Sequence, residues 1–208
     1  MNVQKQVDKS HYKFQNYLPK ERWCSLWHQL DEVIQLKPEK VLEIGPGPGV
    51  FKQMALLMDV SVETLDLDPE LKPDHVGSAT ALPFMTSAYD IVCAFQMLEH
   101  LPYDVSLIAF KEMVRVSQRY VVISLPDARP VWRYQLHIPR FGMCNLLVPR
   151  PQLRVKEHKF DGEHYWEINK RGYKFNRIIS DFSQADVQLI KTYRVPENPY
   201  HRFFVFQK

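Results

Sequence analysis

The feature that most restricts the fold is a glycine-rich turn that directly follows a short apolar run. The run at 41–44 is apolar except for Glu43, and it ends in Gly45-Pro46-Gly47-Pro48-Gly49. A short apolar run bounded by turn residues is typical of a buried strand. Glycines have no Cβ, so they let the backbone pass close to a ligand. The pattern predicts a strand, a turn and a helix around a pocket at the carboxyl end of a sheet.

Strand-like and helix-like segments alternate through the first 125 residues. Short apolar runs predict strands, and apolar residues at helical spacing predict amphipathic helices. Strands joined by helices form βαβ units, which build a parallel sheet with right-handed crossovers. The expected strands span 40–44, 61–67, 75–76, 90–95 and 119–125, and the expected helices span 18–36, 51–58 and 105–116.

The end of the chain predicts a helix at 173–183 and two strands at 187–193 and 202–206. A turn containing two prolines separates these strands, and strands so close in sequence favour an antiparallel hairpin. We therefore expect an α/β fold. It is a Rossmann-like, open, mostly parallel twisted sheet with helices on both faces and a C-terminal antiparallel hairpin.

A chain of 208 residues suits one domain. Within it, residues 126–168 break the regular pattern and contain several prolines, many aromatic residues and charges of both signs. A long irregular stretch inside a compact domain is usually functional or mobile. We expect a single domain, 1–208, made of an N-terminal helical cap (1–39), a cofactor-binding core (40–125), a lid or substrate insertion (126–168) and a C-terminal helix and hairpin that complete the sheet (169–208).

Charge and cysteine content argue against several classes of protein. The net charge is only +3, with no run of Lys and Arg, so we expect no nucleic-acid partner. Cys24, Cys93 and Cys144 stand far apart without a CxxC spacing, which argues against a disulfide framework or a zinc site. The polar N-terminus lacks the apolar region of a signal peptide, and no apolar stretch approaches the ~20 residues that cross a bilayer. We expect a cytoplasmic protein without membrane association.

Two carboxylates accompany the glycine turn. Asp66 ends the next strand, where a carboxylate can accept hydrogen bonds from both ribose hydroxyls of a nucleoside. Glu43 precedes the glycines, where it would repel a pyrophosphate but attract the sulfonium and amino groups of S-adenosylmethionine. The dinucleotide fingerprint Gly-x-Gly-x-x-Gly needs a third glycine at position 50, which is Val50. The charges therefore favour the methyl donor over a nicotinamide dinucleotide.

Four blocks follow one another along the chain: 43–49, Leu65-Asp66-Leu67-Asp68-Pro69, Ala81-Leu82-Pro83-Phe84, and Tyr89-Asp90-Ile91-Val92 with Met97-Leu98-Glu99-His100-Leu101. In this order and spacing they resemble the class I S-adenosylmethionine-dependent methyltransferases, in particular the small type 11 group. The resemblance runs from about Val41 to Leu125. It implies an enzyme that takes S-adenosylmethionine as its cofactor and transfers its methyl group.

Carried over by position, the resemblance implies a role for each matching residue. For the methionine part and the ribose, Glu43 lies near the amino group, Gly45, Pro46 and Gly47 lie against the methionine, and Asp66 holds the ribose. Gly49, the last glycine of the turn, is also expected to be a cofactor-binding residue. For the adenine and the methyl group, Leu67 covers one face of the adenine, Ser78 and Ala79 border its edge, and Phe95 and Gln96 line the floor near the methyl group. Relatives often carry an Asp where this chain has Ser78, and a neutral hydroxyl accepts the adenine bond more weakly than a carboxylate.

Several residues also allow a purely structural interpretation. Asp66 at a strand-to-helix turn is a common helix N-cap, and the pair Glu99-His100 occurs in relatives as a structural element beside the pocket. Methyl transfer needs alignment in a dry pocket, and a base only where the acceptor must lose a proton. No catalytic residue is assigned, and the candidates for a base are His100, His164 and Glu167. For the polar cluster at 158–167, a hydrogen-bonded surface loop is favoured over a metal site, so no metal is expected.

The leading hypothesis is methyl transfer from S-adenosylmethionine to a small or medium-sized acceptor, with the methylated O, N or C atom left open. The alternative is a protein that binds S-adenosylmethionine without turnover, or a subunit that depends on a partner. A third hypothesis, methylation of protein or RNA, lacks the support of a basic run or an appended domain. The sequence leaves the oligomeric state open.

Overall fold

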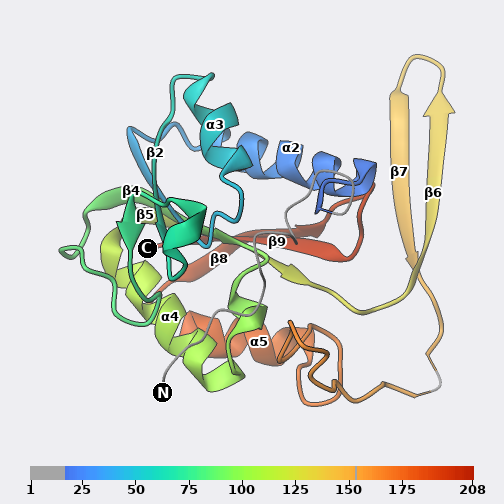
Figure 1. The fold of residues 1–208 in the computed structure, drawn as a ribbon. Coiled ribbons are helices and arrows are strands. Elements are labelled where there is room, and N and C mark those ends of the chain that lie inside the picture. The colour runs from blue at the N-terminus through green and yellow to red at the C-terminus, as the bar shows by residue number, and fades with distance from the viewer. Residues whose placement is uncertain (1–16, 153) are drawn as a thin grey trace.

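The computed structural model describes residues 17–152 and 154–208. The expected absence of a signal peptide, and the first part of the 1–39 cap, concern residues 1–16, outside the described residues. The described chain is built on a seven-stranded sheet with the strand order β3-β2-β1-β4-β5-β9-β8 (Figure 1). The first five of these strands are parallel, as the alternation of strands and helices predicted.

The elements lie close to their expected positions. The parallel strands are β1 (Lys40–Ile44), β2 (Ser61–Asp66), β3 (His75–Val76), β4 (Tyr89–Phe95) and β5 (Ser117–Pro126). The helices are α2 (Lys20–Gln35), α3 (Val50–Leu56), α4 (Tyr103–Val116) and α5 (Phe175–Ser183), with the 3-10 turns η2 (Pro69–Leu71) and η3 (Leu98–His100). Within the described residues, none of the helices is both long enough and apolar enough to cross a membrane.

Helices cover both faces of the sheet, and each face buries its own apolar core. One core joins strand residues such as Leu42 and Val92 to Phe110 of α4 and Phe182 of α5. The other core, on the opposite face, contains residues of α2 and α3 together with strand residues such as Val41. Neighbouring residues of one strand point to opposite faces, so Val41 and Leu42 enter different cores. The nearly continuous apolar character of the central strands follows from this burial on both sides.

The C-terminal strands complete the sheet as an antiparallel pair. Strand β9 (His201–Gln207) lies between β5 and β8 (Gln188–Arg194), and it is antiparallel to both. Although β8 comes first in the sequence, it forms the edge of the sheet, and β9 then pairs between β5 and β8. The predicted fold class, with its mostly parallel sheet and its C-terminal hairpin, is confirmed.

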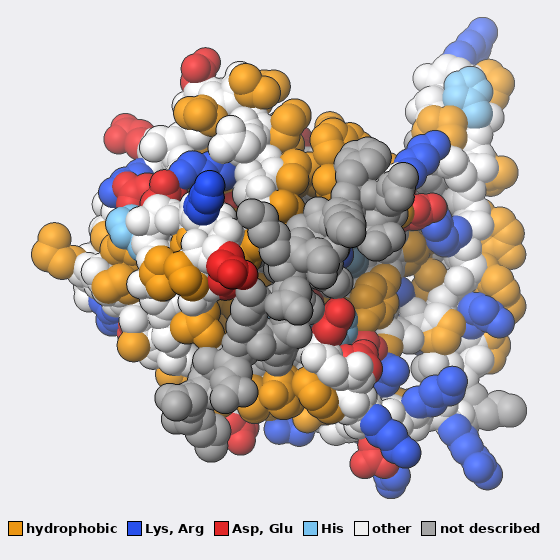
Figure 2. Space-filling model, viewed as in Figure 1, with side chains coloured by type: hydrophobic (Ala, Val, Ile, Leu, Met, Phe, Trp, Pro, Cys, Tyr) orange, Lys and Arg blue, Asp and Glu red, His pale blue; other side chains and the backbone are white. Residues whose placement is uncertain are grey.

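The 126–168 insertion contains a regular element that the sequence analysis did not predict. Strands β6 (Val131–Ile138) and β7 (Gly142–Pro149) form a separate two-stranded antiparallel hairpin that projects from the body of the molecule (Figure 1). The register places apolar residues opposite one another on one face, and Figure 2 shows hydrophobic side chains along the hairpin. This apolar face consists of Trp132, Tyr134, Leu136, Ile138, Cys144, Leu146 and Val148.

The part of the insertion after the hairpin returns to the sheet and packs against it. Trp166 is fully buried, and its Nε1 donates a hydrogen bond to the Leu101 carbonyl at 3.1 Å. At the start of the insertion the buried Asp127 accepts a hydrogen bond from Arg202 at 2.8 Å and one from Asn169 at 2.8 Å. Both ends of the insertion are therefore fixed at the same edge of the sheet, and residues near Trp166 are held against η3.

We predict that Phe110→Ala destabilises the protein by ~3–5 kcal/mol, the usual cost of truncating a buried phenylalanine. Phe110 is 1% exposed and stacks on Phe182 with ring centroids 4.5 Å apart. The matched control is Phe141→Ala at the hairpin tip, where the side chain is 85% exposed and little change is expected. Urea unfolding followed by circular dichroism measures both changes, and equal effects at the two sites would contradict this account of the core.

Candidate functional site

The glycine turn reverses the chain at the carboxyl end of β1. Gly45 has φ +70, and a Cβ there would lie only 2.5 Å from Cγ of Met97. Gly49 has φ +74 and forms the N-cap of α3. The backbone N–H of Gly45 donates to the Leu65 carbonyl of the neighbouring strand at 2.9 Å, which ties the turn to β2. A side chain at position 45 would therefore be opposed both by its backbone conformation and by the methionine beside it.

A cavity of about 330 Å³ opens beside this turn, at the carboxyl ends of β1, β2 and β4. Its volume suits a small-molecule ligand. The structure brings most of the predicted cofactor-binding residues to its wall: Gly45, Gly47, Asp66, Leu67, Ser78, Ala79, Phe95 and Gln96. The catalytic candidates His100 and His164 also line it, whereas Glu167 lies behind His164.

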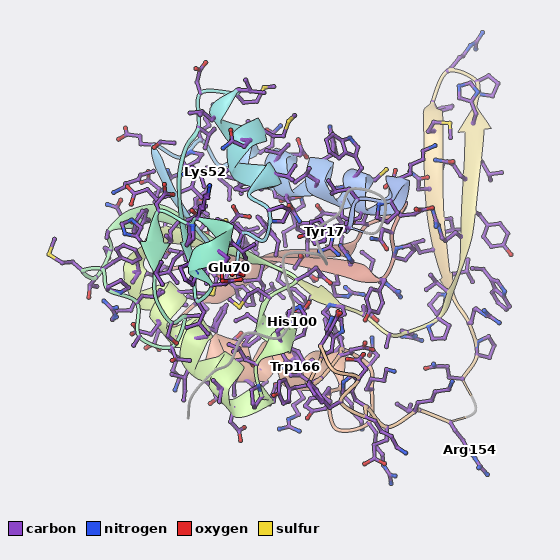
Figure 3. All side chains as sticks on the ribbon, viewed as in Figure 1. Tyr17, Lys52, Glu70, His100, Arg154 and Trp166 are labelled. Atoms are coloured by element: carbon purple, nitrogen blue, oxygen red, sulfur yellow. The ribbon has the colours of Figure 1, made fainter. Side chains whose placement is uncertain are left out.

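Other lining residues come from parts of the chain that sequence reasoning did not connect with the site. Tyr17 and Arg22 lie at the start of the N-terminal helical region, and Tyr200 and His201 lie where β9 begins. Figure 3 shows Tyr17 and His100, which both line the cavity although they are distant in sequence. These positions carry no local motif, so only the fold reveals them. Tyr17 and Arg22 both lie in the segment 1–39 that was expected to form an N-terminal helical cap, but neither was assigned to the site.

Glu43 lies on the other side of the turn, at a smaller cavity of about 40 Å³ that Pro46 also lines. The two cavities share Arg22, Gly45 and Gln96 among their lining residues, so they adjoin at the turn. Glu43 is 3% exposed, and its Oε2 has no hydrogen-bond partner among the described residues. Burial raises the pKa of Glu43 to about 8, although the charge of Lys52 acts in the opposite direction. A buried carboxylate without a partner is a favourable place for a cationic ligand group.

Asp66 borders the main cavity and is not a helix cap. Its Oδ1 accepts the backbone N–H of Asp68 at 2.9 Å, while Asp68 caps η2 by accepting from Glu70 at 3.0 Å. The structural interpretation of Asp66 as an N-cap is therefore wrong, because Asp68 has that role. Burial is the main cause that raises the pKa of Asp66, and the nearby charge of Asp68 adds to it.

Two further lining residues have unusual local structure. The hydroxyl of Ser78 lies 2.8 Å from the hydroxyl of Thr80, which keeps it in a small local network. Gln96 has φ +53, a conformation that residues other than glycine rarely adopt. Its side chain donates to the Ser124 hydroxyl at 3.2 Å and its backbone N–H to the Ser124 carbonyl at 3.0 Å. Strain of this kind persists where surrounding contacts hold it, and it concentrates at binding sites.

A second polar group lies at the end of the cavity nearest η3. His100 Nδ1 is 3.0 Å from the Glu163 carbonyl, and the His100 and His164 ring centroids are 5.0 Å apart. His164 Nδ1 is 3.3 Å from Glu167 Oε1, which also accepts from the Tyr200 hydroxyl at 2.6 Å. The 163–167 segment thus places His164 in the cavity wall, and the Glu167 carboxylate contacts it from the side away from the cavity.

The carboxylates of this group have opposite surroundings. Glu99 is fully buried, and burial raises its pKa to about 7. For Glu167, burial is outweighed by the hydrogen bonds from His164 and Tyr200, so its pKa falls to about 2. Burial lowers the pKa of His164, but the hydrogen bond to Glu167 and the charge of Glu99 outweigh it and raise the pKa. Glu167 is therefore an ionised partner of His164, and it does not face the cavity.

Comparison with known proteins agrees with this geometry. Residues 42–122 match the type 11 family model, which is described as a methyltransferase domain. This segment holds the glycine turn, Asp66, Ser78, Gln96 and the pair at 99–100. A search of curated protein sequences finds no match.

Several solved methyltransferases share the fold. The 1,6-didemethyltoxoflavin-N1-methyltransferase of Burkholderia thailandensis, solved with 1,6-didemethyltoxoflavin and S-adenosylhomocysteine, is 12% identical with a TM-score of 0.63, covering 96% of this chain and 84% of that one. The magnesium protoporphyrin IX methyltransferase of Synechocystis PCC 6803, solved with S-adenosylhomocysteine, is 12% identical with a TM-score of 0.60, covering 90% and 84%. The glycopeptide N-methyltransferase MtfA, solved with S-adenosylhomocysteine, is 10% identical with a TM-score of 0.59, covering 88% of each chain.

The fold and the matched segment define the class of the protein. It has the fold of solved S-adenosylmethionine-dependent methyltransferases, and its residues 42–122 match the type 11 family model of a methyltransferase domain. The predicted class is confirmed. The comparisons do not identify the acceptor.

We predict that the ligand-free protein loses stability as the pH rises from about 4.5 to about 8, and that Glu43→Gln reduces this loss. The pKa of Glu43 is raised from 4.5 to about 8 in the fold, so the folded state holds a proton that the unfolded state releases in this range. Ionisation at higher pH therefore costs folding free energy. The difference between variant and wild type should shift in favour of the variant by on the order of 1–4 kcal/mol, at about 1.4 kcal/mol per pKa unit.

Urea unfolding at pH 4 and at pH 9 measures this shift. The matched control is Glu39→Gln, since Glu39 is exposed and precedes the same strand. A parallel pH dependence of wild type and Glu43→Gln would show that the Glu43 carboxylate is solvated after all.

Proposed function

We propose that this protein transfers a methyl group from S-adenosylmethionine to a small or medium-sized acceptor. The observation that carries the proposal is the buried carboxylate of Glu43 beside the glycine turn, whose Oε2 has no hydrogen-bond partner among the described residues. A neutral or anionic ligand would leave this group uncompensated, whereas an α-amino group would supply the missing charge and hydrogen bonds. The chemistry of this wall of the site therefore fits the methionine end of the methyl donor.

Arg22 supplies the complementary charge for the other end of the amino acid. It lines both cavities and stands over the Tyr17 ring, with its guanidinium carbon 4.0 Å from the ring centroid. We assign Arg22 to the donor carboxylate and Glu43 to the donor amino group. A guanidinium can bind a carboxylate through two parallel hydrogen bonds, which fixes orientation as well as position.

The nucleoside would occupy the main cavity. We assign Asp66 to the ribose hydroxyls, Leu67 to one face of the adenine, and Ser78 and Ala79 to its edge. Leu67 is 38% exposed, so a base lying on it would cover apolar surface that water now contacts. Ser78 offers a neutral acceptor for the adenine amino group in place of a carboxylate.

The methyl group would then lie toward Phe95, Gln96 and the histidines at 100 and 164. When bound, S-adenosylmethionine supplies an activated methyl group on a sulfonium. The protein's own part is to hold an acceptor in line and to exclude water, which the aromatic and apolar side chains of this wall favour. The acceptor end of the site contains His100 and His164 as groups that can take or hold a proton.

The acceptor is expected to be a small molecule handled in the cytoplasm. The Burkholderia thailandensis relative was solved with 1,6-didemethyltoxoflavin, a small molecule, beside S-adenosylhomocysteine, which supports this class of acceptor for a site of similar fold. The small net charge gives no support for a nucleic-acid acceptor. For the insertion, we propose that the 158–168 segment forms part of the acceptor wall, because Glu163 and His164 line the cavity.

We predict that Asp66→Ala weakens S-adenosylhomocysteine binding by ~1–3 kcal/mol, the usual worth of hydrogen bonds to a charged group. Isothermal titration calorimetry measures the change. The matched control is Asp104→Ala, because Asp104 is exposed at the start of α4 and lies outside both cavities. Unchanged affinity in Asp66→Ala would assign the ribose to another group.

A separate assay distinguishes the enzyme from a binder without turnover. The protein is incubated with S-adenosylmethionine labelled on its methyl group, with and without pools of small metabolites. Labelled product that depends on both the protein and the pool supports methyl transfer. Tight donor binding without labelled product from any pool would favour the binding protein or the partner-dependent subunit.

A further inference from the structure

Three side chains that can bind a metal ion converge at the η3 end of the cavity. Glu99, His100 and His164 each offer one ligand atom, and these atoms all lie within 4.8 Å of one another. Two of the residues are adjacent in η3, and the third comes from the return segment of the insertion. The backbone N–H of Tyr165 donates to the Glu99 carbonyl at 2.9 Å, which fixes the two segments to each other. The cluster is therefore a product of the fold rather than of a local motif.

Both histidines are oriented as metal ligands usually are. A metal-bound imidazole typically donates its other ring N–H to a carbonyl or a carboxylate. The Nδ1 of His100 lies 3.0 Å from the Glu163 carbonyl, which can only accept, so this nitrogen carries the proton. The Nδ1 of His164 lies 3.3 Å from the Glu167 carboxylate. In the neutral form of each ring, the lone pair is then on Nε2.

Among the described residues, the carboxylate of Glu99 has none of the hydrogen-bond partners that a buried charge requires. Its side chain is fully buried, and neither Oε1 nor Oε2 has a hydrogen-bond partner among the described residues. Buried carboxylates are ordinarily paired, hydrogen-bonded or bound to a metal. When both rings are neutral and their Nδ1 atoms carry the protons, neither Nε2 can donate to this carboxylate. A cation held by this carboxylate and the two imidazoles would supply the positive charge that balances Glu99.

A second set of potential ligands, Asp161, His164 and Glu167, shares one histidine with the first. Its carboxylates already have partners. Asp161 Oδ1 accepts two backbone N–H groups at 3.0 and 2.8 Å, and Glu167 Oε1 accepts the Tyr200 hydroxyl at 2.6 Å. This set therefore orients His164, and the first set is the one that needs a cation.

We propose that Glu99, His100 and His164 bind one divalent transition-metal ion at the acceptor end of the cavity. Two imidazoles and one carboxylate form a ligand set that suits zinc, manganese or iron, and it is poorly suited to magnesium. Bonds of ~2.1 Å bring tetrahedral ligands to roughly 3.4 Å from one another, so atoms that now lie within 4.8 Å need to approach by at most about 1.4 Å. The proposal departs from the expectation, drawn from the sequence, that the site binds no metal.

Three protein ligands leave a coordination position open toward the cavity, which both histidines line. If the proposed methyl transfer is correct, on which this role depends, the open position would hold an oxygen of the acceptor near the methyl group. A metal ion lowers the pKa of a bound hydroxyl, so the acceptor would release its proton to water without a separate general base. The acceptor class that follows is a molecule with a hydroxyl group able to bind a metal.

The test is zinc binding by the full chain after treatment with a chelator and buffer exchange. Titration calorimetry with zinc chloride is expected to show one site with a dissociation constant of about 1 μM or lower, and weaker binding of manganese, as the order of metal affinities requires. Glu99→Gln and His164→Asn are each expected to weaken zinc binding at least ~10-fold. Zinc should also raise the Tm of the wild type, since a ligand that binds the folded state stabilises it.

The matched control is His137→Asn, because His137 is exposed on the projecting hairpin and its loss should leave zinc affinity unchanged. If both cluster variants fail to fold, X-ray absorption of the zinc-loaded wild type decides the matter, with two imidazole ligands expected. Absence of a stoichiometric site in the wild type, equal affinity in well-folded cluster variants, or a zinc shell without imidazole would each overturn the proposal. Binding of S-adenosylhomocysteine to the same wild-type sample tests the proposed function separately.

Discussion

The parallel pairing of β1 with both β2 and β4 is the constraint on which the site depends. Parallel neighbours end at the same edge of a sheet, so three chain reversals must meet there. The reversals carry the glycine turn, Asp66 and Gln96, and together they form most of the cavity wall. The positive φ of Gly45 and Gln96 is part of the same arrangement, because each residue turns the chain away from the sheet immediately after its strand.

The site contains two buried carboxylates, one on each side of the cavity, that have oxygens without a hydrogen-bond partner among the described residues. Glu43 lies beside the glycine turn, and Glu99 lies behind the histidines of η3 and the return segment. Burial raises the pKa of both carboxyl groups, so each is costly to ionise without a positively charged partner. In our proposals the first is balanced by the amino group of the donor and the second by a metal ion. In both proposals, the positive charge that balances a buried carboxylate comes from the ligand and not from the polypeptide.

The sequence predicted the sheet well, because its strands are short apolar runs that end in recognisable turns. It also located Glu43, Gly45 and Asp66, since the turn and the strand ends are local features. It missed the hairpin, although Trp132, Tyr134, Leu136 and Ile138 alternate in the manner of a strand. The surrounding prolines and charged residues obscured this alternation of apolar and polar residues, which spans only one short segment.

The parts of the site that the sequence could not predict come from contacts between distant segments. Arg22, Tyr200 and His201 reach the cavity only because α2 and β9 lie beside the central strands. Glu99 and His100 are brought to His164 by the docking of Trp166 against Leu101. No spacing rule links these residues, so their shared chemistry becomes visible only when the return path of the insertion is known.

The hairpin of β6 and β7 has a consequence for how this protein behaves in concentrated solution. A ribbon of two strands has an unpaired backbone along both outer edges, and such edges are templates for further strands from other molecules. The apolar face on one side adds an attractive surface to those edges. Arg133 on the opposite face and Arg140 near the tip place like charges on every copy, so that neighbouring ribbons repel before their edges can align. The charge repulsion between these arginines would then oppose aggregation, and high salt would weaken it by screening the charges.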